Sequence, residues 1–527
     1  MRSQFLILLG AFLAPLGGAN PVEHTTRSQL VVHEKRYSHP NWLLTRRLEP
    51  DTPLPLRIAL KQRNLDRLSD LLLEVSDPQS PSYGKHWSAE KVARTFAPPE
   101  SSANAVRGWL QASGVEPARI RRSPNQAWVE VKGATAGEVE RILGTRYHVY
   151  KRDNGGEHIV SDSYYLPRSI SDVVDFITPT IQPDLRLDEV PSYKRRQADP
   201  ASGVIHAKRA ANATGAPTGC DTLVTPDCLR SLYNITYVPK ATDRNTFGVV
   251  NYYANTYLQS DLDTFFRNYS PALVGKSPEF ISIDGGVGEA GWVIQYAMSL
   301  VQPQPVKLLQ LGNAQTGEFR SFNEWLDAVD GSYCTYEGGD DLTYDPPLPN
   351  VLPGGLQQHD CGTVKAPYVV SNSQATHEYA FSQFYLERQC AEFGKLGLMG
   401  MTVMYSAGNV GTAGTQSGYC LDENGSMNVN ATLFNPSWPA SCPWVTAVGG
   451  TQVKKGAAAV PGAEEVWNQE IIPGFFQSGG GGFSNRFSTP AYQKTAVQSY
   501  LQNLQKSDPA HLKLFNKQGV RRHFHRV

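Results

Sequence analysis

Cysteine is absent from the first 219 residues of this 527-residue chain, although seven cysteines follow. They are Cys220, Cys228, Cys334, Cys361, Cys390, Cys420 and Cys442. Because they begin together, we expect a cysteine-free part and a disulfide-bearing part that is exposed to an oxidising compartment. Their odd number predicts a thiol that is free or that pairs outside this sequence.

The glycosylation sequon Asn-x-Ser/Thr has the same late start. It occurs at Asn212, Asn234, Asn268, Asn424 and Asn430, whereas Asn435 is excluded by the proline that follows it. Two independent marks of an extracellular product therefore begin in one region. We predict that these five asparagines carry N-glycans.

Long apolar runs are missing after the N-terminus, since no stretch approaches the roughly 18 residues of a membrane span. Charge of one sign is not in excess either, because 49 Lys and Arg balance 49 Asp and Glu. These absences argue against a membrane anchor and against nucleic-acid binding. Residues 1–19 resemble a signal peptide, with Arg2, an apolar run and small residues at 17–19. We expect a secreted, extracellular protein; the alternative, a buried N-terminal helix, is disfavoured by Pro15.

Motifs of common hydrolases and metal sites are also missing. No Gly-x-Ser-x-Gly elbow occurs, and His377-Glu378 lacks the second histidine of a zinc helix. His359, Asp360 and Cys361 could together ligate a metal, but a disulfide cysteine beside polar loop residues is the preferred interpretation. No metal site is predicted.

A linker is expected at residues 191–219, where proline, small and polar residues follow one another. It contains Lys194-Arg195-Arg196 and Lys208-Arg209, which are either solvated charges or processing sites. Processing would leave Gln197 or Ala210 as the new N-terminus. The predicted organisation is a signal peptide at 1–19, a first domain at 20–190, the linker at 191–219 and a second domain at 220–527.

The first domain is predicted to be an α+β fold. Strands are expected at 54–60, at 120–131 with a break near Asn125, and at 147–151, and helices at 65–75, 101–113 and 136–143. The segment from Ser80 to Pro98, beginning Ser-Pro-Ser-Tyr-Gly-Lys-His-Trp, resembles the activation prodomain of the sedolisins, the serine-carboxyl peptidases. The resemblance covers most of residues 45–185. It implies a ferredoxin-like intramolecular chaperone and inhibitor that is removed in acid.

The second domain alternates strand-like runs at 246–251 and 402–406 with amphipathic helices such as 258–266. Such alternation is typical of a parallel sheet with helices on both faces. Four stretches resemble fungal tripeptidyl-peptidases of the sedolisin family and occur in the same order, at residues 261–270, 326–341, 439–451 and 478–485. The resemblance implies a subtilisin-like parallel sheet flanked by helices.

The resemblance also implies a chemistry. The family uses a serine nucleophile, a glutamate base, an aspartate beside that base and a second aspartate that donates to the oxyanion. In Glu289-Ala-Gly-Trp-Val293, Glu289 falls on the base and Val293 replaces the neighbouring aspartate. Residues four apart share a helix face, where two carboxyls would share a proton, so Val293 predicts a severe loss of rate. Alternatively, Glu289 is a first-turn acid favoured by the helix dipole.

The oxyanion segment resembles Ser406-Ala-Gly-Asn409-Val-Gly, with Asn409 in place of the aspartate. This change is milder, because an amide donates a hydrogen bond at any pH whereas a carboxyl must first be protonated. The alternative for Asn409 is an ordinary turn asparagine beside glycine.

The family's nucleophile segment is missing, since no Gly-Thr-Ser occurs in the 527 residues. The basic tail at 520–527 is interpreted as intron readthrough or a shifted frame, with a small anion-binding patch as a weaker alternative. The resemblance places the family's calcium site in the same missing segment, so no cofactor is assigned. We therefore expect a peptidase domain that is truncated before its nucleophile.

Two hypotheses about function follow. The favoured one is a secreted sedolisin relative that is catalytically impaired or inactive and still binds peptides. The other is a working acid peptidase, releasing tripeptides from N-termini, whose true C-terminus is missing from this sequence. The expected partners are peptide or protein substrates and the chain's own prodomain, with no nucleic acid and no membrane.

Overall fold

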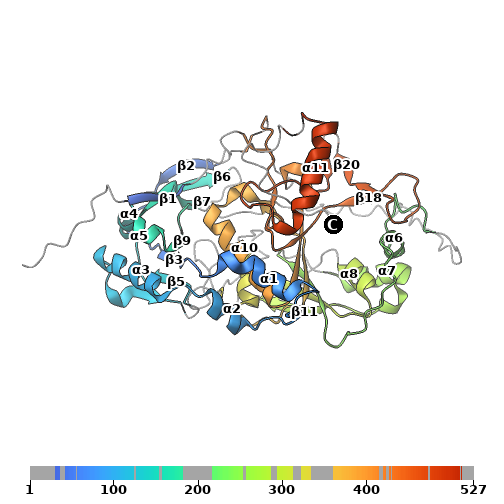
Figure 1. Cartoon of the computed structure of the whole chain (residues 1–527), viewed down its shortest axis with the longest axis horizontal. Coiled ribbons are helices and arrows are strands. Elements are labelled where there is room, and N and C mark those ends of the chain that lie inside the picture. The colour runs from blue at the N-terminus through green and yellow to red at the C-terminus, as the bar shows by residue number, and fades with distance from the viewer. Residues whose placement is uncertain are drawn as a thin grey trace, which may run out of the picture.

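A computed structural model gives the fold of the chain (Figure 1). It describes residues 30–35, 42–54, 56–123, 126–152, 157–181, 216–252, 257–286, 294–311, 322–333, 360–414, 419–422, 427–428, 430–472, 475–510 and 512. The predicted signal peptide and both basic processing sites lie outside this part. No helix among the described residues is long and apolar enough to cross a membrane.

The N-terminal unit, residues 30–181, is built on an antiparallel sheet in the order β4-β5-β3-β9. Its strands are β3 (Leu56–Leu60), β4 (Ile120–Arg122), β5 (Trp128–Val131) and β9 (Val174–Thr178). Helices α1 (Leu68–Ser76), α2 (Ala89–Phe96) and α3 (Glu100–Ala112) connect β3 to β4, and α4 (Ala136–Leu143) follows β5. Counted along the chain, the strand order is 4-1-3-2, which is the ferredoxin-like arrangement that the resemblance implied.

Smaller sheets complete this unit. They pair β1 (Leu30–Lys35) with β8 (Ser163–Pro167), and β6 (Tyr147–Arg152) with both β2 (Trp42–Arg47) and β7 (Glu157–Ser161). The short helix α5 (Arg168–Ser171) leads into β9.

Local signals determine the ends of α4. The Thr135 hydroxyl accepts a bond from the Glu138 backbone N–H, and Gly144 ends the helix at a φ of 61°. A capping threonine and a left-handed glycine are standard start and stop signals, so the helix predicted at 136–143 is confirmed with those bounds.

The second unit, residues 216–512, contains a six-stranded sheet in the order β11-β12-β10-β13-β15-β17, in which every pairing is parallel. The strands are β10 (Phe247–Asn251), β11 (Glu279–Ile283), β12 (Val306–Leu311), β13 (Val369–Asn372), β15 (Thr402–Ser406) and β17 (Thr446–Val448). The sheet grows in both directions from β10. Ligands of such doubly wound folds bind at the carboxyl ends of the strands, near the point where the order reverses.

Helices cover both faces of this sheet. They are α7 (Gln259–Tyr269), α8 (Ile294–Val301), α9 (Asn323–Val329) and α10 (Gln383–Leu398). Helix α6 (Pro226–Leu232) contacts α8, and α11 (Lys494–Ser507) is the last helix described in the unit. Val249 packs with α7 and α8, whereas Val250 packs with α9 and α10. Neighbouring residues of a strand point to opposite faces, so these helix pairs lie on opposite sides, as the sequence predicted.

Short antiparallel pairs extend the second unit beyond the main sheet. They are β14 (Thr376–His377) with β16 (Ser437–Trp438), β18 (Thr451–Val453) with β19 (Glu464–Val466), and β20 (Asn468–Ile472) with β21 (Phe475–Ser478).

The N-terminal unit packs against α10, and Figure 1 shows α1 in blue beside α10 in orange. Leu68 and Leu71 of α1 form an apolar cluster with Ala391 and Leu398 of α10. The prodomain-like segment takes part directly, because the Trp87 N–H donates to Leu398 O (2.8 Å). The residues that carried the resemblance therefore lie in the contact between the two units.

Disulfides occur only in the second unit among the described residues. They join Cys220 to Cys228 and Cys390 to Cys442, and Cys361 is also disulfide-bonded. The bonded state of Cys361 agrees with the interpretation that it is not a metal ligand. Cys420 carries a free thiol, which accounts for the odd cysteine count.

Candidate active site

Asn409 lies just beyond the carboxyl end of β15. Its backbone N–H donates to Gly414 O (3.1 Å), and its carbonyl accepts from the Ser478 N–H (2.9 Å). Gly408 precedes it at a φ of 98°, where a Cβ atom would stand 2.2 Å from Gly414 O. The turn therefore requires glycine at position 408 and holds a half-buried Asn409 with a fixed backbone.

A glycine-rich loop packs against this turn. The Gly480 N–H donates to Gly408 O (2.8 Å), and a Cβ atom on Gly480 would stand 2.0 Å from Ala407 O. A Cβ atom on Gly479 would likewise stand 2.2 Å from Gly450 O. The glycines of the motif at 478–485 thus allow three backbone segments to touch beside Asn409.

A buried serine and a buried carboxylate anchor the end of that loop. The Ser484 hydroxyl donates to Glu378 Oε1, and the Asn485 N–H donates to Glu378 Oε2 (2.8 Å). Ser484 Oγ also accepts from the Phe487 N–H (2.9 Å). Only 1% of Glu378 and 2% of Ser484 are exposed. A substrate cannot reach this serine, so the contact is structural.

Three neutral polar side chains lie beneath the same edge of the sheet. The Tyr252 hydroxyl, just after β10, donates to Asn372 Oδ1 at the end of β13 (3.2 Å) and lies 3.5 Å from the Tyr405 hydroxyl. Burial raises the pKa of both Tyr252 and Tyr405 above its usual range. Both phenols are therefore uncharged in acid and at neutral pH.

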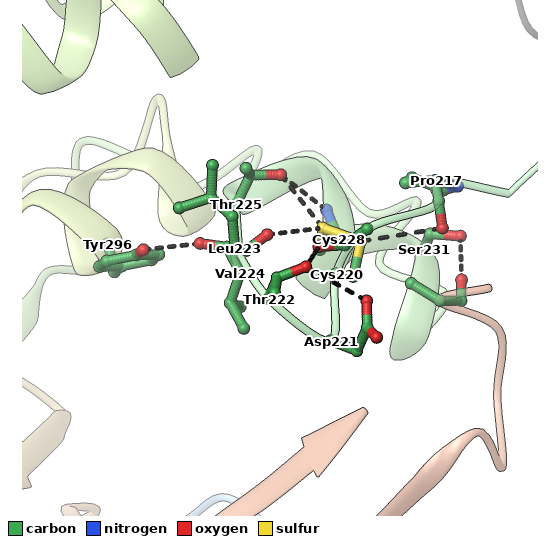
Figure 2. Close-up of a disulfide and its surroundings, with 12 residues drawn as sticks. Pro217, Cys220, Asp221, Thr222, Leu223, Val224, Thr225, Cys228, Ser231 and Tyr296 are labelled. Carbon is green, nitrogen blue, oxygen red and sulfur yellow. Dashed lines mark hydrogen bonds between the residues drawn. A yellow bond between two sulfur atoms is a disulfide. The ribbon is translucent and has the colours of Figure 1, made fainter. Parts of the chain in front are cut away.

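Helix α8 is held by the disulfide loop that opens the second unit. The Tyr296 hydroxyl donates to Val224 O (2.7 Å), and Figure 2 shows this side chain reaching the loop closed by Cys220 and Cys228. Arg230 of α6 donates to Ser299 O (2.8 Å) and to Leu300 O (3.1 Å) at the C-terminal end of α8. A cation on the final carbonyls of a helix satisfies unpaired acceptors and opposes the negative end of its dipole.

The chain is similar to known proteins along most of its length. The pro-kumamolisin activation domain matches residues 40–182. Tripeptidyl-peptidase SED1 of Arthroderma otae is 37% identical over 527 residues, covering 90% of this chain and 77% of that protein. Aorsin of Aspergillus oryzae is 33% identical, covering 90% of this chain and 75% of that protein. The chain belongs to the sedolisin family.

A solved Pseudomonas sedolisin, a serine-carboxyl proteinase complexed with two molecules of pseudo-iodotyrostatin, is 20% identical. The match covers 52% of this chain and 66% of the Pseudomonas sedolisin chain, with a TM-score of 0.33. We transfer no residue correspondence from it.

The predicted site residues of this sedolisin have different outcomes. Glu289 and Val293 lie outside the described residues, and α8 begins directly after them at Ile294. Their roles stay predictions. Asn409 is described and lies at the carboxyl edge of the sheet, where the fold places ligands.

The structure describes some of the predicted glycosylation sites and not others. Asn234, Asn268 and Asn430 are exposed, as an acceptor of a glycan must be, whereas Asn212 and Asn424 lie outside the described residues. No modification is tested by this exposure.

A metal site was not predicted, although calcium was expected for the family. Among the described residues, no three His, Cys, Asp or Glu side chains are grouped so that they could hold an ion. The expectation that this chain holds no cofactor stays a prediction, and no catalytic step is assigned to a metal.

Proposed function

We propose that this sedolisin is a secreted proprotein whose second unit binds peptides in acid, and whose peptidase activity is impaired by Val293. The supporting observation is the contrast between two positions. Asn409 stands on a fixed backbone at the ligand-binding edge, whereas valine follows Glu289 at the place of the family's second carboxyl. The scaffold is thus retained while one proton-transfer group is replaced.

The replacement of the family's aspartate by Val293 affects the general base. A general base in acid must lose a proton while most free carboxyls still hold theirs, and a neighbouring carboxyl that shares the proton assists this. Valine can neither share a proton nor accept a hydrogen bond. Glu289 would then lack the carboxyl that orients it, and a positioned acid–base group contributes about 10²–10⁴ in rate.

The change at Asn409 is expected to be tolerated. An amide N–H aimed at a developing oxyanion is worth about 3–4 kcal/mol in other hydrolases, and it donates without prior protonation. The backbone of Asn409 is held on both sides, by Gly414 and by Ser478. We therefore assign most of the impairment to Val293.

The proposal also gives the N-terminal unit a role in folding. Its apolar contact with α10 buries Leu68, Leu71 and Ala391, and signature residue Trp87 bonds to the end of that helix. We infer that this unit supports folding of the second unit and is separated from it by cleavage within 191–219.

The test is release of N-terminal tripeptides at about pH 4, where a glutamate base titrates. The nucleophile motif that these 527 residues lack must come from the native gene. The protein is therefore secreted from that gene and compared with V293D and with V293D/E289Q. We expect V293D to raise the rate about 100-fold and E289Q to remove that gain. Wild-type turnover that V293D leaves unchanged would overturn the proposed impairment.

A noncatalytic role is the second candidate, favoured by the same valine. In that case V293D gains no activity, while calorimetry at the same pH shows that the wild type binds peptides with free N-termini. Asn409→Leu, which removes the amide without adding charge, should then weaken binding.

A further inference from the structure

Two buried aspartates from distant parts of the chain exchange hydrogen bonds beside the strand that precedes Glu289. The Asp284 N–H donates to Asp360 Oδ2 (2.8 Å), and the Asp360 N–H donates to Asp284 Oδ1 (2.6 Å). Only 1% of Asp284 and 9% of Asp360 are exposed. Each carboxyl therefore fixes the backbone of the other residue.

Asp284 lies in a tight turn. It has a φ of 52°, Gly285 has a φ of 76°, and the Gly286 N–H donates to Ile283 O (3.0 Å). Two successive positive φ angles with this bond define a type I′ turn. A Cβ atom on Gly286 would stand 2.1 Å from Gln310 O, so the turn is pressed against the end of β12. The chain then continues directly into the segment 287–293, which carries Glu289.

Asp360 is itself firmly held. Its Oδ1 accepts from the Thr363 hydroxyl (2.6 Å), and the next residue, Cys361, is disulfide-bonded. The Gly362 N–H donates to Asp327 O of α9 (2.8 Å). The 360–363 loop is thus a fixed point to which the turn after β11 is tied.

The electrostatics of the pair depend on a proton. Two buried carboxylates that each bind the other residue's backbone repel each other when both are ionised, and one bound proton removes that repulsion. Burial, and then the charge of Asp360, raise the pKa of Asp284 to about 7, while the Asp360 N–H bond opposes the rise. Asp284 Oδ2 is buried and has no hydrogen-bond partner among the described residues, so this oxygen can carry the proton.

Other charges on the packed elements are few. Glu279 of β11 and Lys307 of β12 pair with each other at the opposite, amino ends of their strands (3.3 Å). Helix α9, which contacts β11, carries the buried acids Glu324 and Asp327 and is followed by the buried Asp330, so it brings no cation to the pair.

We propose that Asp284 and Asp360 are positioning residues that hold the turn preceding the Glu289 segment only while Asp284 keeps a proton. In acid Asp284 is protonated and uncharged, and the turn stays bonded to the 360–363 loop. Above neutral pH both carboxyls are charged, the repulsion opposes the two reciprocal bonds, and the turn loosens. Only the role given to Glu289 rests on the proposed function; the lock itself does not.

The test is amide hydrogen exchange of the full-length chain at about pH 5 and pH 8, corrected for intrinsic exchange rates. We expect the amides of Asp284, Gly286 and Asp360 to lose protection by about tenfold at the higher pH, one pH unit above the pair's titration. In D284N, whose amide oxygen still accepts the Asp360 N–H, that dependence should vanish. Equal dependence in D284N and the wild type would overturn the lock.

D263N is the matched control, because Asp263 Oδ1 also accepts a backbone N–H, from Gly275 (2.8 Å), but from the exposed surface of α7. It should retain the wild-type response at Asp284. Should D284N fail to fold, infrared difference spectra of the wild type decide the point. A carboxylic-acid band of a buried residue at about pH 5 that is lost by about pH 8 supports the lock, and its absence at both pH values contradicts it.

The role in catalysis is read separately, in the V293D background. There, D284N should extend activity to higher pH through kcat and leave KM unchanged, because only the geometry of the base is affected. Unchanged kcat at every pH, with the exchange result intact, would refute the positioning role and leave the lock. Failure of V293D itself would refute the proposed function and leave the exchange experiment decisive.

Discussion

Arg388 of α10 pairs with Asp175 of the N-terminal unit, with Nη1 lying 3.0 Å from Asp175 Oδ2. The same nitrogen donates to Leu60 O (3.0 Å), and only 1% of Arg388 is exposed. Burial raises the pKa of Asp175, and the Arg388 charge opposes that rise. A buried cation of the second unit thus depends on the N-terminal unit for its counter-ion.

D175N should therefore destabilise the full chain. The amide still accepts a hydrogen bond, but it leaves the buried guanidinium without a counter-charge, which costs about 3 kcal/mol. The measurement is the free energy of urea unfolding. E90Q is the control, because Glu90 pairs with Arg94 on the surface and such pairs contribute about 0–1 kcal/mol. Equal effects of the two substitutions would show that the Arg388 contact adds no stability.

Adjacent residues of β1 should give opposite pH dependences. His33 stacks on Phe384 of α10 with ring centroids 4.9 Å apart, and burial lowers its pKa from 6.5 to about 4. Burial raises the pKa of Glu34 from 4.5 to about 7. Lys61 disfavours the charged form of His33, and Asp175 disfavours that of Glu34.

The signs follow from proton uptake. Below pH 6.5 the unfolded chain protonates His33 while the folded chain does not. The contribution of His33 to the free energy of unfolding is therefore lost as pH falls toward about 4. Between pH 4.5 and about 7 the folded chain keeps the Glu34 proton that the unfolded chain releases. The contribution of Glu34 to the free energy of unfolding is therefore lost as pH rises. In the wild type the two slopes nearly cancel between pH 4.5 and 6.5.

Single substitutions should expose each slope. With H33Q, the free energy of unfolding should fall with rising pH, and with E34Q it should rise, each by up to about 1.4 kcal/mol per pH unit. Chemical unfolding at a series of pH values measures both. Parallel curves for the wild type and both variants would mean that neither residue titrates with a shifted pKa.

The sequence predicted those parts of the fold that depend on local signals. Helix 136–143 was found with its observed bounds because its cap, Thr135, and its stop, Gly144, lie within the segment. The strand at 402–406 was found because its apolar residues are contiguous. Helix α2 was missed, although Ser88 caps it, because its segment was interpreted only as a family signature.

The candidate site was only partly predictable. Asn409 was identified because Ser406-Ala-Gly-Asn409-Val-Gly resembles the family's oxyanion segment. Asp284 gave no signal, because its partner Asp360 lies 76 residues further along the chain. The same holds for Glu378 and Ser484, separated by 106 residues. Such pairs are created by the order of the strands in the sheet, and no spacing within one sequence reports it.

Removal of the cation at the end of α8 should loosen that helix. R230A removes the Arg230 donor from Leu300 O and leaves Ser299 O bonded to the Gln302 amide (3.0 Å), and it should cost about 1 kcal/mol. Hydrogen exchange of the amides in the last turn of α8 reports the change. R267A is the control, since Arg267 lies in the last turn of α7, is exposed, and donates within its own helix, to the Thr264 hydroxyl. Equal exchange of α8 in R230A and the wild type would rule out the cap.

Alanine should destabilise the protein strongly at one of two neighbouring glycines and hardly at all at the other. At Gly480 the new Cβ atom would stand 2.0 Å from Ala407 O, so the loop must move away from the turn that holds Asn409, at a cost of about 3 kcal/mol. At Gly481 no atom lies within 4 Å of the new Cβ, and G481A should change stability by only about 0.5 kcal/mol. Thermal unfolding compares the variants. If G480A is as stable as G481A, the loop does not pack on Ala407, and the rigid backbone assigned to Asn409 is wrong.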